Sequence, residues 1–195
     1  MDDSCLLGFR PLASTKVPRM EFSAEVVVAY PLGAVFEAYR ERIVEVVPHL
    51  PNIRSIVVKS RTEGVLGDAP TVAFVNEWHG GGDIPKVVRS VVSEDRLAWT
   101  DRAVWNLNES TVDYEIEVHA FPGAVTCKGH NTFFSAGTGT RVRLAGELTV
   151  DATKVPGVPK FVAGTLNGTA EKFIIGSIRE NLIAVAKAVE RLLAS

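Results

Sequence analysis

The sequence predicts an α+β fold in which a curved antiparallel sheet packs against one long C-terminal helix. Between Thr169 and Leu193, apolar residues recur every three or four positions and charged residues lie mostly on the opposite side, which is typical of an amphipathic helix. A run of strand-like segments and one early helix precede it. Because an apolar helix face needs a surface to cover, we expect the strands to form that surface. The apolar residues of the helix are Ile174, Ile178, Leu182, Val185, Val189 and Leu192.

Length and composition favour one domain. The chain has 195 residues, of which 46% are hydrophobic, so it can bury one core and is short for two domains. We assign residues 20–195 to this domain and residues 1–19, which show no clean period, to an N-terminal extension. A net charge of −2 gives no basic field for nucleic acid. The sequence does not indicate an oligomeric state.

The chain lacks the marks of a membrane or secreted protein. No run approaches the roughly 20 apolar residues that a membrane span requires, and the acidic start lacks the basic end of a signal peptide. We therefore expect a cytoplasmic protein without stable membrane insertion. Cys5 and Cys127 lie far apart, which predicts neither a disulfide framework nor a zinc site.

In the first half of the domain, a helix is flanked by strands. Pro31 opens the helix, and Pro48 forces its end. β-branched and aromatic residues indicate the strands. After a glycine turn, Asp83 can cap a short helix, although the many valines that follow disfavour a helix there. The expected elements are a strand over Phe22–Ala29, a helix over Pro31–Val47, strands over Ile53–Lys59 and Pro70–His79, and the short helix over 84–92.

The second half predicts a meander followed by the long helix. Segments rich in Gly, Asn and Pro separate the strands, and along residues 111–119 apolar and polar side chains alternate, as a sheet with one buried face requires. Residues 152–168 are open to three interpretations: a loop, a short helix from Pro159, or an early kinked part of the final helix. The expected strands are Leu97–Trp105, Ser110–Phe121, Val125–Phe134 and Thr140–Val150.

This order of elements resembles the helix-grip fold of the START, Bet v 1 and polyketide-cyclase superfamily over residues 20–195. The helix start Pro31–Phe36, the turn Leu50–Ile53 and the strand Trp99–Trp105 carry the resemblance. The strand ending near Trp78 also looks like PRELI-type lipid-transfer proteins. The resemblance implies a START-like helix-grip domain with a cavity between sheet and helix. For lipid-transfer members it implies a membrane-touching loop, here at residues 155–162, and hence transient membrane contact.

Strand alternation predicts a polar group within an apolar wall. Asp101 shares its strand face with Trp99 and Trp105, and Asn76 shares its own with Trp78. An apolar surface with a few polar groups is typical of a small-molecule pocket. The competing interpretation places Asp101 in an ion pair with a nearby arginine, Arg102 or Arg143, or at a solvated strand end.

The sequence carries no recognised catalytic or metal-binding motif. None of the four histidines shows metal-ligand spacing, and His119 and His130 form at most a surface pair across a hairpin. No nucleophile elbow or phosphate loop is present. We therefore expect no metal, no cofactor, and simple binding in preference to catalysis.

Three hypotheses follow. The leading one is a binding or transport protein for a hydrophobic or amphipathic, lipid-like small molecule. The second is a cyclase or aromatase that uses the same pocket, with Asp101 as acid or base. The third is an interaction module whose interior is filled and binds no ligand. The predicted ligand-binding residues are Phe74, Asn76, Trp78, Trp99, Asp101, Trp105, Tyr114, Ile116, Asn131, Leu144, Ile174 and Ile178.

Overall fold

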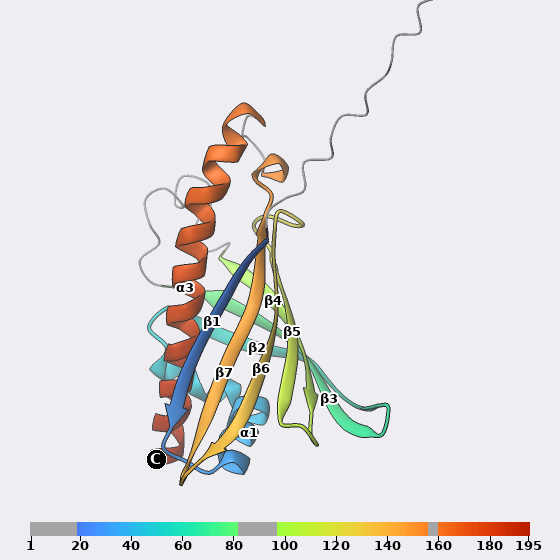
Figure 1. Cartoon of the computed structure of the whole chain (residues 1–195), viewed down its shortest axis with the longest axis vertical. Helices are drawn as coiled ribbons and strands as arrows, with labels where there is room; N and C mark the ends of the chain where they lie inside the picture. Colours follow the sequence, from blue (N-terminus) through green and yellow to red (C-terminus); the bar gives the residue numbers. More distant parts are fainter. Residues whose placement is uncertain (1–18, 82–96, 156–159) are drawn as a thin grey trace, which may run out of the picture.

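A computed structural model describes residues 19–81, 97–155 and 160–195 of the chain (Figure 1). Three predicted features lie wholly or partly outside the described residues. They are residues 1–18 of the extension, the short helix at 84–92, and residues 156–159 of the membrane-touching segment 155–162. The described elements are β1 (Arg19–Val28), α1 (Leu32–Glu41), the 3-10 helix η1 (Ile43–His49), β2 (Ile53–Leu66), β3 (Ala69–Gly80), β4 (Ala98–Asn106), β5 (Thr111–Val118), β6 (Val125–Ala136), β7 (Gly139–Val150), the 3-10 helix η3 (Ala152–Lys154) and α3 (Lys160–Ala194).

The fold is the predicted α+β arrangement. Seven strands form one antiparallel sheet in the order β1-β7-β6-β5-β4-β3-β2, and α3 runs along β1 and β7 (Figure 1). The side chains of α3 that face the sheet pack against inward residues of these strands, such as Leu148 and Val142. Glu190 of α3 also accepts a hydrogen bond of 2.9 Å from the backbone N–H of Ala29. The helix and the sheet therefore enclose the interior of the molecule.

Three element boundaries differ from the sequence prediction. The helix predicted over Pro31–Val47 ends at Glu41 and continues as η1, because a run of β-branched residues and the missing N–H of Pro48 disfavour α-helix there. Strand β2 continues to Leu66 and forms a hairpin with β3 around Gly67, whose φ is 60°. The last helix begins at Lys160. Residues 160–168 therefore belong to its early part, which is close to the third interpretation of residues 152–168.

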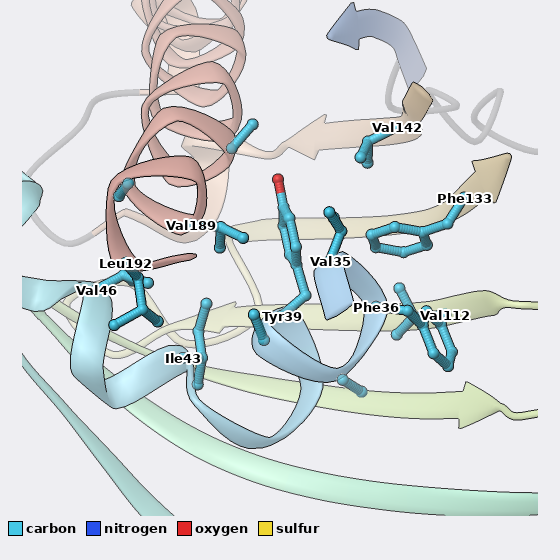
Figure 2. Close-up of a cluster of buried hydrophobic side chains, with 14 of the residues drawn as sticks. Val35, Phe36, Tyr39, Ile43, Val46, Val112, Phe133, Val142, Val189 and Leu192 are labelled. Carbon is cyan, nitrogen blue, oxygen red and sulfur yellow. The ribbon is translucent and has the colours of Figure 1, made fainter. Parts of the chain in front are cut away.

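One end of the interior is a filled apolar core. Helices α1 and η1 cover this end of the sheet, and the last turns of α3 close it with Val189 and Leu192 (Figure 2). Phe133 of β6 contacts the rings of Phe36 and Tyr39 with centroids 5.2 Å away in each case. Edge-to-face contacts of this kind stabilise a core beyond the burial of area alone.

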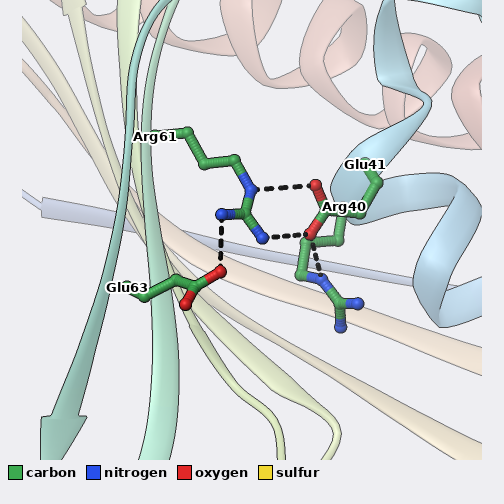
Figure 3. Close-up of polar contacts among 4 residues, drawn as sticks. All are labelled: Arg40, Glu41, Arg61 and Glu63. Atoms are coloured by element: carbon green, nitrogen blue, oxygen red, sulfur yellow. Dashed lines mark hydrogen bonds and ion pairs between the residues drawn. The ribbon is translucent and has the colours of Figure 1, made fainter.

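A surface ion-pair network joins α1 to the β2–β3 hairpin at the same end. Arg61 of β2 bonds Glu41 at 3.1 Å and Glu63 at 2.8 Å, and Arg40 bonds the same Glu41 carboxylate at 2.9 Å (Figure 3). The bond from Arg61 is the main cause that lowers the pKa of Glu41. This network lies outside the core and fixes the end of α1 over the sheet.

No helix among the described residues has both the length and the apolar character needed to cross a bilayer.

Candidate functional site

The candidate site lies on the inner face of the sheet, beyond the filled core. Asp101 is in the middle of β4, between Asn76 of β3 and Ile116 of β5 in the strand register. Ala103 and Trp105 share the face of Asp101 and are buried, whereas Arg102, next to Asp101 in the strand, is exposed. Strand alternation therefore directs the Asp101 carboxyl inward.

Two indole rings lie beside this carboxyl group. Trp78 pairs with Trp99 across β3 and β4, and their rings stack with centroids 5.9 Å apart and planes inclined by 15°. Both side chains are only partly buried. The pair forms an aromatic wall on the same face of the sheet, at the next inward position along the strands from Asn76 and Asp101.

Asp101 is an unusual carboxyl group because its surroundings disfavour its charge. Burial raises its pKa to about 6, and hydrogen bonding from the side chains of Asn76 and Trp78 partly opposes the rise. The Trp78 contribution is weak, since Nε1 reaches no acceptor at full hydrogen-bond geometry. The interpretation of Asp101 as an arginine partner is wrong, because both arginines pair with other carboxylates. Arg102 Nη1 lies 3.3 Å from Glu117 Oε2, and Arg143 Nη2 lies 3.4 Å from Glu25 Oε2.

Tyr114 and Cys127 complete the inner row around Asp101. The Tyr114 ring lies over Gly129, where a Cβ atom would come within 2.2 Å of it, and its hydroxyl donates to the Ala145 carbonyl at 3.4 Å. Cys127 lies opposite Ile116 and is buried. Burial raises the pKa of the Cys127 thiol to about 12 and also raises the pKa of Tyr114, and in both cases the Asp101 charge adds to the rise.

Buried polar atoms without a partner occur both beside Asp101 and among the residues of the filled core. In the described part of the chain these are the Tyr39 hydroxyl, Asn76 Oδ1, Trp78 Nε1 and Asn131 Oδ1. Each such atom costs about 1–3 kcal/mol when nothing replaces its lost water. In Figure 2 the Tyr39 hydroxyl points away from α1, toward the interior between α3 and the sheet. Since native proteins rarely leave buried polar atoms unpaired, these atoms are candidate partners for ordered water or for a bound molecule.

Packing is looser around Asp101 than in the filled core. Asp101 lies deep within the fold, yet its side chain keeps part of its accessible surface. On α3, Ile178 and Leu182 face this end and are also partly exposed. The described side chains at this end are therefore packed less completely than those of the filled core.

The predicted ligand-binding residues fall into three groups. Asn76, Trp78, Trp99, Asp101, Tyr114 and Ile116 face the polar part of the interior, and Ile178 faces it from α3. Phe74, Trp105 and Leu144 are buried in the filled core, and Asn131 lies between Leu144 and Val112 of that core. The side chain of Ile174 lies outside the described residues. Their role in binding stays a prediction.

Tyr39 and Cys127 are not among the residues that the sequence pattern predicts for the site. Tyr39 belongs to the apolar face of a helix, where an aromatic ring indicates packing, and only its position in the fold reveals an unpaired hydroxyl. Cys127 could have been found, since strand alternation places it on the inner face next to Ile116.

The histidines predicted to form a surface pair have separate partners. His119 lies 2.7 Å from the hydroxyl of Thr100, and His130 lies 2.8 Å from the carboxylate of Asp113. Asp113 and His130 face outward, beside an open groove of about 730 Å³ on the outer face of the sheet. We do not place the site there, because the groove is shallow, and because His130 already pairs with Asp113 and Lys128 with the nearby Glu115.

Comparison with known proteins identifies the fold. No family model and no curated protein matches the sequence. Among solved structures, the Zhui aromatase/cyclase from Streptomyces sp. R1128 is similar with a TM-score of 0.63 and 16% identity over 89% of this chain and 92% of its own. TTHA0849 from Thermus thermophilus has a TM-score of 0.62 and 19% identity over 90% of this chain and 99% of its own.

A plant protein shows the same likeness more weakly. The major latex-like protein 151 from Panax ginseng has a TM-score of 0.53 and 13% identity over 89% of this chain and 96% of its own. Identities this low compare architecture and not chemistry. The finer likeness to PRELI-type proteins stays a prediction. In its sheet order and its long C-terminal helix, this chain has the helix-grip fold of the START, Bet v 1 and polyketide-cyclase superfamily.

Proposed function

We propose that this protein binds a hydrophobic or amphipathic small molecule between the inner face of its sheet and α3. The observation that carries the proposal is the set of unpaired buried polar atoms on Tyr39, Asn76, Trp78 and Asn131. A bound molecule with matching polar groups supplies the missing partners and offsets the cost of burying them.

The surroundings of these atoms suit such a molecule. Apolar side chains of β5, β6 and α3, among them Ile116, Val118 and Ile178, form a second cluster beside the filled core. Tyr114 and Leu182 border both clusters. Apolar walls with few, directed polar groups are the usual composition of a small-molecule site. In this arrangement Asn76, Asp101 and Asn131 select the ligand, and the apolar walls supply most of the affinity.

Native mass spectrometry of gently purified protein tests the proposal, together with titration of Nile red, a neutral apolar dye. We expect saturable dye binding at one molecule per chain and a small-molecule adduct that organic extraction releases. Replacing Asn131 with Leu removes one unpaired acceptor and fills its space, so we expect weaker dye binding and less adduct. The matched control is Thr132→Val, which changes the next residue of the same strand on the outer face.

Two results would contradict this function. One is an adduct-free mass together with no saturable dye binding by the wild type, which would favour a filled interior. The other is equal loss of binding in Asn131→Leu and Thr132→Val, which would show that the effect does not depend on the inner face.

A second function is favoured by the pKa of Asp101. A carboxyl group with a pKa of about 6 exchanges protons readily near neutral pH, as a general acid or base must. The shared fold with an aromatase/cyclase supports the same idea at the level of architecture. If the protein is an enzyme of this kind, Asp101→Asn keeps the extracted molecule bound but no longer converts it, which mass spectrometry of the incubated compound measures.

A further inference from the structure

The interior around Asp101 contains acidic groups and no described basic group that acts on it. Among the described groups, burial and the hydrogen bonds from Asn76 and Trp78 affect the pKa of Asp101, and no described cation contributes. The other titratable side chains of this row, Tyr114 and Cys127, are also acids, and the Asp101 charge raises the pKa of both. Ionised Asp101 therefore makes this part of the interior electrically negative.

Nearby basic residues have partners on the outer face. Arg102 pairs with Glu117 at 3.3 Å, and Lys128 pairs with Glu115 at 3.2 Å. Both basic side chains are exposed and alternate with inward residues of their strands. The countercharge of a buried carboxylate is normally a cation in direct contact. The described chain does not provide one for Asp101.

The unpaired groups beside Asp101 are one acceptor, Asn76 Oδ1, and one donor, Trp78 Nε1, whose hydrogen bond to the Asp101 carboxylate is weak. Asn76 Oδ1 is buried and unpaired, and Asn76 and Asp101 lie directly opposite each other on adjacent strands. Two acceptors at this spacing suit a group with several N–H donors. The stacked rings of Trp78 and Trp99 lie one step along the strands, and aromatic faces attract cations.

We propose that the molecule bound at this site carries a protonated amine on an apolar body, and that Asp101 and Asn76 Oδ1 accept its hydrogen bonds. This inference rests on the proposed binding function and adds the chemical class of the ligand. The ammonium group supplies the missing countercharge, and the apolar body occupies the wall formed with α3. Charge-assisted hydrogen bonds of this type are stronger than neutral ones, so the amine contributes to selectivity as well as affinity.

Three probes of equal chain length test the inference: decylamine, decan-1-ol and decanoate. Isothermal titration calorimetry at about pH 7.5 measures each probe, because Asp101 is then mostly ionised and the amine protonated. We expect decylamine to bind about tenfold or more tightly than decan-1-ol, and decanoate to bind most weakly. In Asp101→Asn, the ratio between decylamine and decan-1-ol should fall to near unity.

Asp113→Asn is the matched control, since Asp113 is an exposed carboxylate on the outer face of the neighbouring strand β5. Asp113→Asn should keep the preference for decylamine. If the amine only adsorbed to surface charge, Asp101→Asn and Asp113→Asn would change its binding alike. Binding of decan-1-ol as tight as that of decylamine, or an amine preference that survives Asp101→Asn, overturns this inference alone. Failure of all three probes to bind overturns the binding function as well.

Discussion

The two ends of the interior differ although the same strands build both. Near α1, inward residues such as Val112, Phe133 and Val142 are almost completely buried and pack against aromatic rings. Around Asp101, inward residues such as Trp99 and Ile116 remain partly exposed, and the polar atoms Asn76 Oδ1 and Trp78 Nε1 lack partners. The filled end also holds two unpaired polar atoms, on Tyr39 and Asn131, but there the surrounding side chains are apolar and buried. A regular alternation along a strand therefore does not determine whether an inward position becomes core or site.

What covers the sheet accounts for part of this difference. At the filled end, α1, η1 and the last turns of α3 press apolar side chains onto the strands. At the other end, the described cover is the middle of α3, whose inward residues Ile178 and Leu182 are only partly buried. The filled end then supplies stability, and the looser end is the part of the interior where we propose binding.

The largest effect should come from the filled end. We expect Phe133→Ala to lower the free energy of unfolding by about 3–5 kcal/mol, because it removes a buried ring that contacts three others and leaves a cavity. Trp99→Ala should lower it much less, since that ring is partly exposed, but it should weaken Nile red binding more. Urea unfolding and dye titration of both variants measure the two effects. The same loss of stability in both variants would remove the distinction between the ends.

The second effect concerns Asp101 and has the opposite sign. We expect Asp101→Asn to raise the free energy of unfolding by about 2–3 kcal/mol at about pH 7.5, since its pKa of about 6 exceeds the ordinary value of 3.8 by some two units at about 1.4 kcal/mol each. The ionised carboxylate is destabilising in the folded protein, and an amide of the same shape is not.

The pH dependence of this gain follows from the two pKa values. Folded Asp101 binds a proton more tightly than unfolded Asp101, so its contribution to stability falls as pH rises from about 4 to about 6 and is constant above that range. The gain of the variant should therefore be full at about pH 7.5 and small at about pH 4. Urea unfolding of both proteins at each pH measures it. A pH-independent difference would show that Asp101 does not titrate in this range.

A third variant tests the fit of Tyr114 over the inner face. In Gly129→Ala, the new methyl group would lie 2.2 Å from the Tyr114 ring and 2.5 Å from the Ala145 carbonyl oxygen, so something must move. We expect a loss of about 1–3 kcal/mol in the free energy of unfolding, as is usual for overpacking, together with altered dye binding because Tyr114 is displaced. Thermal unfolding and dye titration measure both. Unchanged stability would mean that the ring does not rest on Gly129.

The sequence predicted the sheet and the inward position of Asp101 because both follow from short-range alternation. Asn76 and Asp101 required only the assignment of two strands and their parity. The extension of β2 to Leu66 was not predictable in this way, since beyond Ile56 its residues are exposed on both faces and carry no alternation. The break after Glu41 depends on Pro48, which the sequence analysis used only as the end of the helix.

The unpaired polar atoms could not be predicted from the local sequence pattern. A hydroxyl at Tyr39 or an amide at Asn131 is equally compatible with a satisfied core or with a site, and the difference lies in which groups the fold brings within reach. Whether a basic residue pairs with Asp101 also depends on long-range neighbours. The outward direction of Arg102 follows from strand alternation, but the pairing of Arg143 with Glu25 of β1 depends on the strand order. Long-range neighbours therefore define the site, and local pattern defines the wall on which it lies.

The smallest effect should come from Gly176. Glycine inside a helix costs up to about 1 kcal/mol relative to alanine, and a methyl group at Gly176 meets nothing within 4 Å, so Gly176→Ala should raise the free energy of unfolding by about 0.5–1 kcal/mol. Gly33→Ala in α1 is the control, because its methyl group is also free of contacts but lies at the filled end. Gly176 lies on the same stripe of α3 as the exposed Glu180 and Lys187, so both variants should leave Nile red affinity unchanged. A change of dye affinity in Gly176→Ala alone would place the dye against the outward stripe of α3 and not between the helix and the sheet.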